Sequence, residues 1–504
     1  MSTDQAHAAF FAEVAAALGD AAVNCTHETI VRYGENHLPT GDRRPAGVVY
    51  PGSTAEVQRI VAAANTHGVV VYPISTGQNQ GLGLRSPVHA GQVVMDLGRR
   101  MHRVLELDER LAYAVIEPGV TYQQLYDELG LRGHRLMLDT TSGPPAGGVL
   151  GNTLDGGAGY TPYFDHFYMA CGMEVVLGDG RVLRTGDGAL PDSRAWHVSK
   201  YSMGPRLDGL FVQSNLGIVT RMGVWLMPRP PSIRGFFFAF PEDEDLAEII
   251  ELVRPLKLAN VVPTLFKVTN DIYALGTECS SPEYAAKGGA QALSDGTRRE
   301  LREHYGCGAW LVSGAFYGAS EAALAPFIER VRAHFMQSGR ATYIDHDTAD
   351  ANPMLRIHLD SFRGVPTPAE LKLLGWRPGG GLIWFLPGTP MVGEVANAHQ
   401  ALARRIYTEH GLEYICEYVC GARFARGLHV LVYNREDEHE TARADACYRE
   451  LTRAFTAAGY SVGRAATGYQ ALHLGTLDPT YTGVVRALKS TLDPAGVLAA
   501  GRYA

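Results

Sequence analysis

The sequence contains no run of lysine or arginine residues and no basic stripe. Its 504 residues carry 45 Lys and Arg against 53 Asp and Glu, which gives a formal net charge of −8. Surfaces that bind nucleic acid need clustered positive charge. The composition therefore excludes nucleic acid as the main partner.

Long apolar runs are also missing. No stretch reaches the roughly 18 apolar residues that a membrane-spanning helix requires, so no membrane partner is expected. Residues 1–20 lack the basic start and apolar centre of a secretory signal, and Ala8–Leu18 has the pattern of an amphipathic helix. These features predict a cytoplasmic protein.

Cysteine is scarce and has no framework spacing. The chain has seven cysteines, an odd number that fits reduced thiols. Cys416 and Cys420 lie in a strand-like run and would face the same side. No second ligand pair has the spacing of a zinc site, so we expect these two to pack in a core, with no metal.

Glycine, in contrast, is plentiful, with 57 residues. Residues 73–83 read Pro-Ile-Ser-Thr-Gly-Gln-Asn-Gln-Gly-Leu-Gly and follow the apolar run Val69–Val71. Successive backbone N–H groups in such a turn form a concave anion site suited to a phosphate or pyrophosphate. An ordinary loop between strands remains the alternative, because a glycine-rich loop alone is a weak motif.

The residues before this loop favour a β-α-β unit. Gly47–Tyr50 has the pattern of a strand, and Ser53 with Glu56 forms a capping box. An apolar series at helical spacing follows, and Gly68 stands where a C-terminal cap belongs. The spacing matches neither a Rossmann fingerprint nor a Walker loop.

Further along, residues 139–165 form a second glycine-rich stretch, which suggests another backbone surface against a ligand. Residues 173–184 predict a β-hairpin with its turn at 178–180. After the proline-rich segment 227–231 the pattern changes to strands alternating with single helices, which indicates an antiparallel sheet covered on one face. With 504 residues, at least two domains are expected.

Several of these segments resemble the vanillyl-alcohol oxidase / p-cresol methylhydroxylase flavoproteins, including bacterial eugenol oxidases. The resemblance is collinear from about Pro45 to Pro228, returns at the C-terminus and is looser between. The segments that carry it are Pro73–Gly77, Glu117–Tyr122, Gly151–Asp155, Gly159–Tyr163, Gly188–Pro191, Gln213–Thr220 and Asp493-Pro494.

The resemblance implies an α+β, two-domain FAD-binding fold of the vanillyl-alcohol oxidase type with an antiparallel-sheet cap domain. Residues 1–228 and 460–504 would form the FAD-binding domain, and residues 229–459 the cap. The implied FAD-binding residues are Ile74, Ser75, Thr76, Gly77, Gln78, Asn79, Gly81, Leu82, Pro118, Ser142, Gly147, Gly148, Gly151, Asn152, Gly159, Gly217, Ile218, Val219 and Arg502.

The chain departs from the family pattern where the family holds a phenolate with tyrosines and an arginine. Leu82 and Gly463 stand at two tyrosine positions, which leaves Tyr160 and Arg464 as the expected catalytic residues. No carboxylate aligns with the family's acid near flavin N5; Ser142 or Gly143 falls there. His166 is expected to be structural.

The family's covalent flavin link falls on Arg426 and Gly427, so non-covalent FAD is expected. His429 could make the link only after a register shift. The resemblance therefore implies an FAD-dependent oxidoreductase with a rebuilt pocket, which oxidises an aromatic or other small alcohol by hydride transfer. The alternatives are a 4-alkylphenol oxidase or hydroxylase, or a catalytically silent flavin- or ligand-binding protein. Expected partners are a small-molecule substrate, molecular oxygen or an electron carrier, and a second copy in a homodimer.

Overall fold

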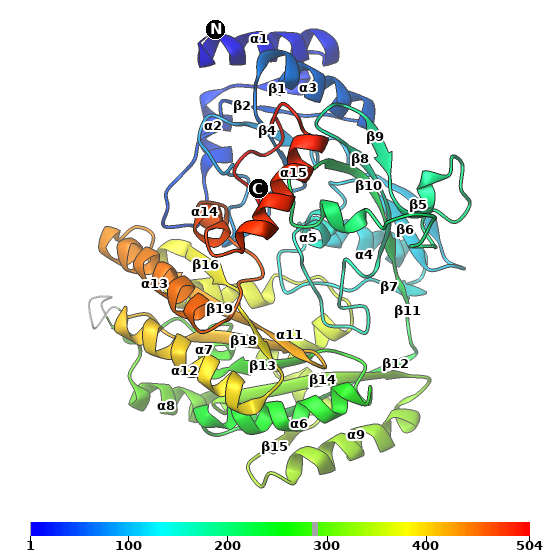
Figure 1. The fold of residues 1–504 in the computed structure, drawn as a ribbon. Coiled ribbons are helices and arrows are strands. Elements are labelled where there is room, and N and C mark those ends of the chain that lie inside the picture. The colour runs from blue at the N-terminus through cyan, green and yellow to red at the C-terminus, as the bar shows by residue number, and fades with distance from the viewer. Residues whose placement is uncertain (1, 285–290, 504) are drawn as a thin grey trace.

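Two layers of structure lie one above the other in Figure 1, a computed structural model that describes residues 2–284 and 291–503. The upper layer holds the N-terminal half of the chain and the C-terminal helix α15. The lower layer is a large sheet with helices, formed by the middle of the chain. The outer limits proposed for the first and last segments, residues 1 and 504, lie outside the described residues.

The first sheet of the upper layer contains the predicted β-α-β unit. Its strand order is β1-β2-β4-β3, and β4 pairs in parallel with β2 and β3. Ser53 accepts a hydrogen bond from the Glu56 amide, and Gly68 ends the helix at φ +65°. The β-α-β unit is confirmed, whereas the capping box is only half formed, because the Glu56 side chain accepts from the Gly52 amide and not from that of Ser53. The elements are β1 Val23–Asn24, β2 Gly47–Val49, α3 Thr54–His67, β3 Val71–Ile74 and β4 Val93–Asp96, with α1 Thr3–Leu18 and α2 His27–Gly34 beside them.

The second sheet of this layer is antiparallel, with the order β5-β6-β10-β8-β9. Its strands are β5 Val104–Asp108, β6 Tyr113–Ile116, β8 Ala170–Val176, β9 Val182–Arg184 and β10 Ile218–Trp225. The predicted hairpin is formed by β8 and β9. Helices α4 Tyr122–Leu131 and α5 Val149–Leu154 share a buried apolar cluster with this sheet. The short strands β7 Leu136–Met137 and β11 Met227–Pro228 pair where the chain leaves the layer.

The lower layer is built on an eight-stranded sheet in which every pairing is antiparallel, as predicted. The order is β15-β12-β14-β13-β18-β19-β16, and β17 pairs with β19. The strands are β12 Ser232–Phe240, β13 Phe266–Asn270, β14 Trp310–Gly318, β15 Thr342–Ile344, β16 Gly381–Phe385, β17 Gly388–Pro390, β18 Ile415–Cys420 and β19 Phe424–Tyr433.

One face of this sheet packs against four helices. These are α6 Leu246–Leu258, α9 Glu321–Met336, α12 Gly393–Glu409 and α13 Glu438–Ala457. Cys416 and Cys420 point together into this core, as predicted for packing residues. All seven cysteines are free.

The opposite face is covered as well, so the prediction of one covered face is wrong. In β14, Val312 packs with the four helices, whereas its neighbour Leu311 packs with α10 and α11 on the other side. Both residues are buried, and alternation cannot reveal a second cover when both faces are apolar. The elements on this side are α7 Asp271–Leu275, α8 Asp295–Tyr305, α10 His346–Ala351, α11 Pro353–Phe362 and the 3-10 segment Ala369–Trp376.

The C-terminal tail, with α14 Gln470–Leu474 and α15 Pro479–Leu492, returns to the first sheet. Val71 of β3 donates to Val497 and accepts from Ala499, each at 2.8 Å. The tail therefore continues the edge of the N-terminal sheet, which supports the proposed division into 1–228, 229–459 and 460–504. No helix among the described residues combines the length and the apolar character needed to cross a bilayer.

Candidate functional site

A cavity of about 800 Å³ opens between the two layers. Its wall combines the glycine-rich loops of the upper layer, the C-terminal tail, and strands β16 and β19 of the sheet below. All but one of the residues predicted to bind a cofactor or substrate line this cavity. Those present are Ile74, Ser75, Thr76, Gly77, Gln78, Asn79, Leu82, Pro118, Ser142, Gly147, Gly148, Gly151, Asn152, Gly159, Tyr160, Gly217, Ile218, Val219, Arg464 and Arg502.

Gly81 is the exception. A β-carbon on Gly81 would lie 2.6 Å from the Trp384 ring and 2.7 Å from Leu382 Cγ, and its φ is +69°. The residue is therefore a glycine because the loop packs against β16 of the cap sheet. The sequence pattern could not separate this packing role from contact with a ligand.

The loop at 75–79 has the geometry of an anion site. Among the described residues, none of the amides of Thr76 through Asn79 donates a backbone hydrogen bond. Gly77 has φ +64°, the left-handed conformation that lets successive N–H groups point to one side. Four adjacent unbonded donors in a cavity wall are suited to a phosphate or pyrophosphate.

The second glycine stretch lies against this loop. A β-carbon would be 2.1 Å from Ser75 Oγ if built on Gly148, and 2.7 Å from Ser75 Cβ if built on Gly151. The Ser75 hydroxyl also donates to the Pro118 carbonyl. The glycines therefore let three loops pack together into one continuous wall, in addition to bringing backbone to the cavity.

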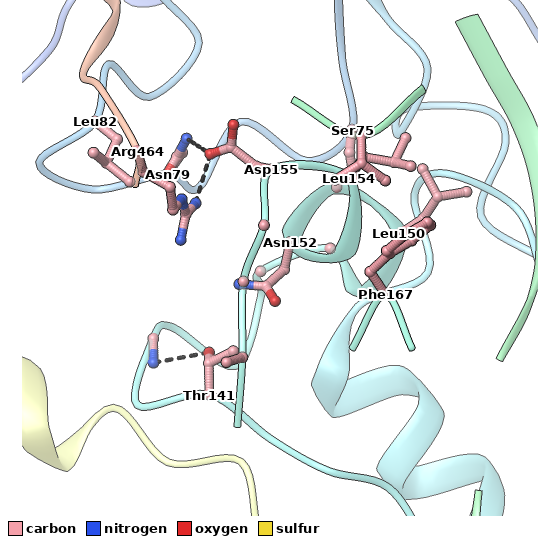
Figure 2. Close-up of a pocket in the computed structure, with 18 of the residues that line it drawn as sticks. Ser75, Asn79, Leu82, Thr141, Leu150, Asn152, Leu154, Asp155, Phe167 and Arg464 are labelled. Atoms are coloured by element: carbon pink, nitrogen blue, oxygen red, sulfur yellow. Dashed lines mark hydrogen bonds and ion pairs between the residues drawn. The ribbon is translucent and has the colours of Figure 1, made fainter. Parts of the chain in front are cut away.

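Asp155 links three segments at the cavity (Figure 2). Its carboxylate is 2.5 Å from Arg464 Nη2 and 2.8 Å from Arg502 Nη2, and accepts a bond from Asn79 at 3.2 Å. The Tyr503 hydroxyl donates to the same carboxylate. Burial by itself raises the pKa of Asp155, but Arg464 and Arg502 outweigh burial and hold it well below its usual range.

Arg464, one of the two expected catalytic residues, is not a free cation. Its charge is paired with Asp155, which was not among the expected site residues. The Nε atom of Arg464 is nevertheless buried and has no hydrogen-bond partner among the described residues. Arg464 therefore keeps one unused hydrogen-bond donor in the wall of the cavity.

Tyr160 belongs to a second group of polar residues at the cavity. Its hydroxyl donates to Glu417 Oε1 at 3.0 Å and accepts from Ser142 Oγ at 2.9 Å. Burial, followed by the charges of Glu417 and Glu370, raises the pKa of Tyr160 well above its usual value. The two roles considered for Tyr160, a packed aromatic ring and a site residue, are both compatible with this position.

The acidic partners of Tyr160 come from the cap. Lys267 of β13 lies 3.4 Å from Glu417 and 3.2 Å from Glu370, and its Nζ is 4.1 Å from the centre of the Tyr160 ring. Tyr273 donates to Glu370 at 2.7 Å. Burial raises the pKa of Glu417, and Lys267 only partly offsets this. The group holds two carboxylates and one ammonium, so a proton can be accommodated on Glu417.

Strand alternation places this group. In β13, Phe266 and Val268 point into the helix-covered core, which turns Lys267 toward the other layer. In β18, Cys416 and Tyr418 point into the same core, which turns Glu417 toward Tyr160. None of the three cap residues, Lys267, Glu370 and Glu417, was predicted from the sequence. For Lys267 and Glu417 the available signal was a charge inside an otherwise apolar strand, whereas Glu370 lies in the 3-10 segment Ala369–Trp376.

Tyr160 itself is positioned by Asp139, the first residue of the second glycine-rich stretch. Asp139 Oδ1 accepts hydrogen bonds from the amides of Tyr160, at 3.1 Å, and Thr161, at 2.8 Å. Its other oxygen is 2.8 Å from His166 Nε2, and His166 Nδ1 is 2.7 Å from Asn152. His166 thus holds Asp139 and Asn152 in place, in agreement with its expected structural role.

β19 places Arg426 and His429 on opposite faces. Phe424, Arg426 and Leu428 line the cavity, whereas Ala425 packs in the helix-covered core and the His429 ring lies 5.2 Å from His399 on that side. A shift of one residue would be needed to turn His429 toward the cavity.

A family model described as FAD binding domain matches residues 45–186. The cavity fits FAD: it is walled by separate loops, offers four unbonded amides at 76–79, and contains the buried Arg464 Nε and Asn215 Oδ1 without partners among the described residues. A long ligand with a pyrophosphate and several ring acceptors can satisfy such dispersed groups.

The chain is 34% identical over 490 residues to the 4-cresol dehydrogenase [hydroxylating] flavoprotein subunit of Pseudomonas putida, covering 97% of this chain and 93% of that one. It is also 34% identical, over 500 residues, to 1'-carboxy-chondrochloren decarboxylase of Chondromyces crocatus, covering 92% and 91%. The crystal structure of p-cresol methylhydroxylase with substrate bound superposes with a TM-score of 0.96 at 33% identity, over 99% of this chain and 97% of that one. 4-Ethylphenol oxidase from Gulosibacter chungangensis, in its isoeugenol complex, superposes with a TM-score of 0.95 at 33% identity, over 99% of this chain and 97% of that one. The chain belongs to the vanillyl-alcohol oxidase / p-cresol methylhydroxylase family of FAD-dependent oxidoreductases.

Proposed function

We propose that this enzyme oxidises an alcohol on an aromatic or other small molecule, in a pocket rebuilt from that of the phenol-oxidising relatives. The observation that carries the proposal is the chain of hydrogen bonds from the cavity through Tyr160 to the buried Glu417. This chain offers an alcohol a place to lose its proton.

Oxidation of an alcohol to a carbonyl removes a hydride from carbon and a proton from oxygen. FAD, when bound, supplies the hydride acceptor. The proton from the substrate hydroxyl passes to the Tyr160 oxygen as Tyr160 gives its own proton to Glu417. A hydroxyl has two acceptor sites, so Tyr160 can accept from the substrate while it retains Ser142.

The part of the pocket beside Arg464 supports a change of substrate. Leu82 and Gly463 stand where the resemblance places two tyrosines, and Leu82 lines the cavity beside the Asp155–Arg464 pair in Figure 2. Without those hydroxyls, a phenolate would lose two hydrogen bonds of about 1.5–3 kcal/mol each when the acceptor is charged. We therefore expect a bulkier or less acidic substrate than a simple 4-alkylphenol.

Two other functions are separated from this one by the same experiment. The names of three relatives, which refer to 4-cresol, p-cresol and 4-ethylphenol, favour a 4-alkylphenol oxidase or hydroxylase. The pairing of Arg464 with Asp155 neutralises an expected catalytic charge, which is compatible with a protein that binds flavin without turnover. The name of another relative refers to a carboxylated compound, so carboxylated alcohols belong in the substrate panel.

The experiment mixes FAD-loaded protein anaerobically with vanillyl alcohol, 4-ethylphenol and a panel of larger aromatic and aliphatic alcohols, and follows loss of the flavin absorbance. Faster bleaching by the larger alcohols supports the proposal. Fastest bleaching by the simple phenols would favour the alkylphenol activity. Flavin that dithionite reduces but no compound bleaches would indicate a silent binding protein. Reoxidation in air against reoxidation by a dye then separates oxygen from an electron carrier as the acceptor.

A further inference from the structure

We infer that Arg426 forms an anion-binding subsite in this cavity, which holds a carboxylate group of the substrate. The inference rests on the proposed function, because it describes the substrate class of the same cavity. It depends on three observations: the guanidinium has no acidic partner, it lines the cavity, and a glycine opposite makes room for it.

Arg426 is a half-buried cation of the wall whose charge no acid neutralises, whereas Arg423, which also has no ion pair among the described residues, is exposed to solvent. Its guanidinium donates one hydrogen bond, from Nη1 to the carbonyl of Gly156 at 3.3 Å, and forms no ion pair among residues 2–284 and 291–503. The neighbouring cations differ, since Arg464 and Arg502 share Asp155. The cavity therefore has an excess of positive charge at Arg426.

The surroundings make this unpaired charge costly. Burial, followed by the nearby charge of Arg464, lowers the pKa of Arg426, and the attraction of Asp165 is the weakest influence. A buried cation that loses water without gaining an acid is destabilising. A carboxylate is the group that best restores the balance, because the guanidinium can hold both of its oxygens at once.

Gly463 is what allows Arg426 to occupy this place. A β-carbon on Gly463 would lie 3.0 Å from Arg426 Nη2 and 3.1 Å from Cζ. Gly463 is fixed there by its own backbone, which donates to Leu386 at 2.9 Å and accepts from Gln213 Nε2 at 2.6 Å. The Arg426 guanidinium on the cap side thus fills the space beside Gly463, where the resemblance places a tyrosine.

The cofactor is a less suitable source of the anion. The unbonded amides at 76–79 already form a site for a pyrophosphate, and they belong to the upper layer. Arg426 belongs to β19 of the cap, and Phe424 and Leu428 on the same face of the strand give the cavity apolar surface around it. An arginine set between apolar groups is suited to the acidic end of an otherwise apolar molecule.

The test measures binding of benzoate and benzamide to the FAD-loaded protein by isothermal titration calorimetry. The two molecules have nearly the same shape and differ in charge, and neither carries an alcohol to oxidise. The wild-type protein should bind benzoate about ten- to a hundredfold more tightly, the effect of a charge-assisted bidentate pair. Equal affinities in the wild type would overturn the inference without any mutant.

Arg426→Met should reduce the preference to about twofold or less, and Arg426→Lys should retain part of it. Arg423→Met is the matched control, because Arg423 also lines the cavity but is exposed, and this variant should keep the wild-type preference. An equal loss of the benzoate preference in Arg426→Met and Arg423→Met would show that the positive potential of the whole cavity attracts benzoate, and would overturn the inference of a specific site.

The FAD content of each variant is measured alongside. Retention of one FAD per chain by Arg426→Met supports a substrate subsite, whereas loss of FAD would show that Arg426 holds the cofactor and would overturn the inference. Because benzoate and benzamide are not oxidised, this result is independent of the bleaching experiment that tests the proposed function.

Discussion

The guanidinium of Arg426 occupies the space next to the α-carbon of Gly463, so that a β-carbon on Gly463 would lie only 3.0 Å from Arg426 Nη2. One residue comes from a cap strand and the other from the segment that leads to the C-terminal tail. The positions to which the resemblance assigns a tyrosine and a flavin-linking residue are therefore in contact.

This contact predicts coupling between substitutions. Gly463→Tyr should lower the melting temperature by several degrees, because the ring must displace the guanidinium or the chain. The same substitution in an Arg426→Ala background should cost about 1 kcal/mol less, a coupling typical of residues in contact. Gly483→Tyr is the control, since nothing lies within 4 Å of its β-carbon position on exposed α15. Equal costs in both backgrounds would rule out the contact.

The position of His429 predicts non-covalent FAD. Acid precipitation should release the flavin into the supernatant, because Arg426 stands at the cavity face of β19 and His429 points into the helix-covered core. His429→Ala should leave the ratio of released to bound flavin unchanged. Colour retained in the wild-type pellet and lost from the His429→Ala pellet would show that the strand register differs from the one described here.

The Tyr160–Glu417 pair predicts a pH-dependent rate. Tyr160→Phe should slow flavin reduction at saturating substrate by about a hundredfold, the lower range for loss of a proton acceptor. The wild-type rate should rise with pH as Glu417 loses its proton, at a pH above the ordinary range for a glutamate because burial raises its pKa.

Glu417→Gln should abolish that rise, whereas Ser142→Ala should retain it, because Ser142 donates to Tyr160 but does not stand between Tyr160 and Glu417. A pH profile unchanged in Glu417→Gln would assign the proton to another group. The readout is the anaerobic bleaching rate of the flavin between pH 5.5 and about 9.

The position of Asp155 between two arginines predicts that removal of its charge strongly lowers the free energy of unfolding. Asp155→Asn leaves two largely buried arginines without their shared acid, which should destabilise the protein by about 3 kcal/mol, as for other broken buried pairs. Arg464→Ala should lower the free energy of unfolding by less, because Arg502 remains paired with Asp155. It should nevertheless impair turnover of the true substrate. The control is Asp179→Asn, which breaks a pair whose arginine is 69% exposed and should cost about 0.5 kcal/mol or less. Similar costs in both aspartate variants would contradict the central position of Asp155.

Buried histidines predict loss of stability in mild acid. Burial lowers the pKa of His399 to about 3 and that of His473 to about 4, so both stay neutral in the folded chain. The unfolded chain takes up these protons from about pH 6.5 downward. Each buried histidine therefore lowers stability as the pH falls below 6.5, by about 1.4 kcal/mol per pH unit once its unfolded form is protonated. The raised pKa of Glu417 acts in the opposite direction, so the histidine contribution is measured as a difference between the wild type and a variant.

The measurement is the melting temperature between pH 7 and pH 5, compared for the wild type and His399→Gln. The variant should show a shallower decrease, because one of the protons is no longer taken up on unfolding. An identical slope in the two proteins would show that His399 does not contribute in this range. Asp155 does not interfere, since its effect falls at much lower pH.

Local sequence determined the loops of the site. Ser53, Gly68 and Gly77 act through neighbours within a few residues, by capping and by allowed backbone angles, so their pattern can be read from the sequence alone. Gly81, Gly148 and Gly151 differ, because segments distant in the sequence leave no room for a β-carbon at these positions. Nearly all residues that the family resemblance implies at the cofactor, from Ile74 to Arg502, line one cavity.

Tertiary structure decided which charges meet. Asp155 reaches Arg464 across 309 residues of chain, and Tyr160 reaches Glu417 across 257. A charged residue in a strand has no local signature of its partner, and Lys267 and Glu417 were therefore not predicted. The cover on the second face of the cap sheet was not predicted for a related reason. Strands that are buried on both faces lose the alternation of apolar and polar residues that marks an exposed side. The sequence by itself thus specified the backbone cradle through short-range sterics, whereas the pairing of its charges, and the charge left unpaired on Arg426, came from long-range packing of the cap and tail on that cradle.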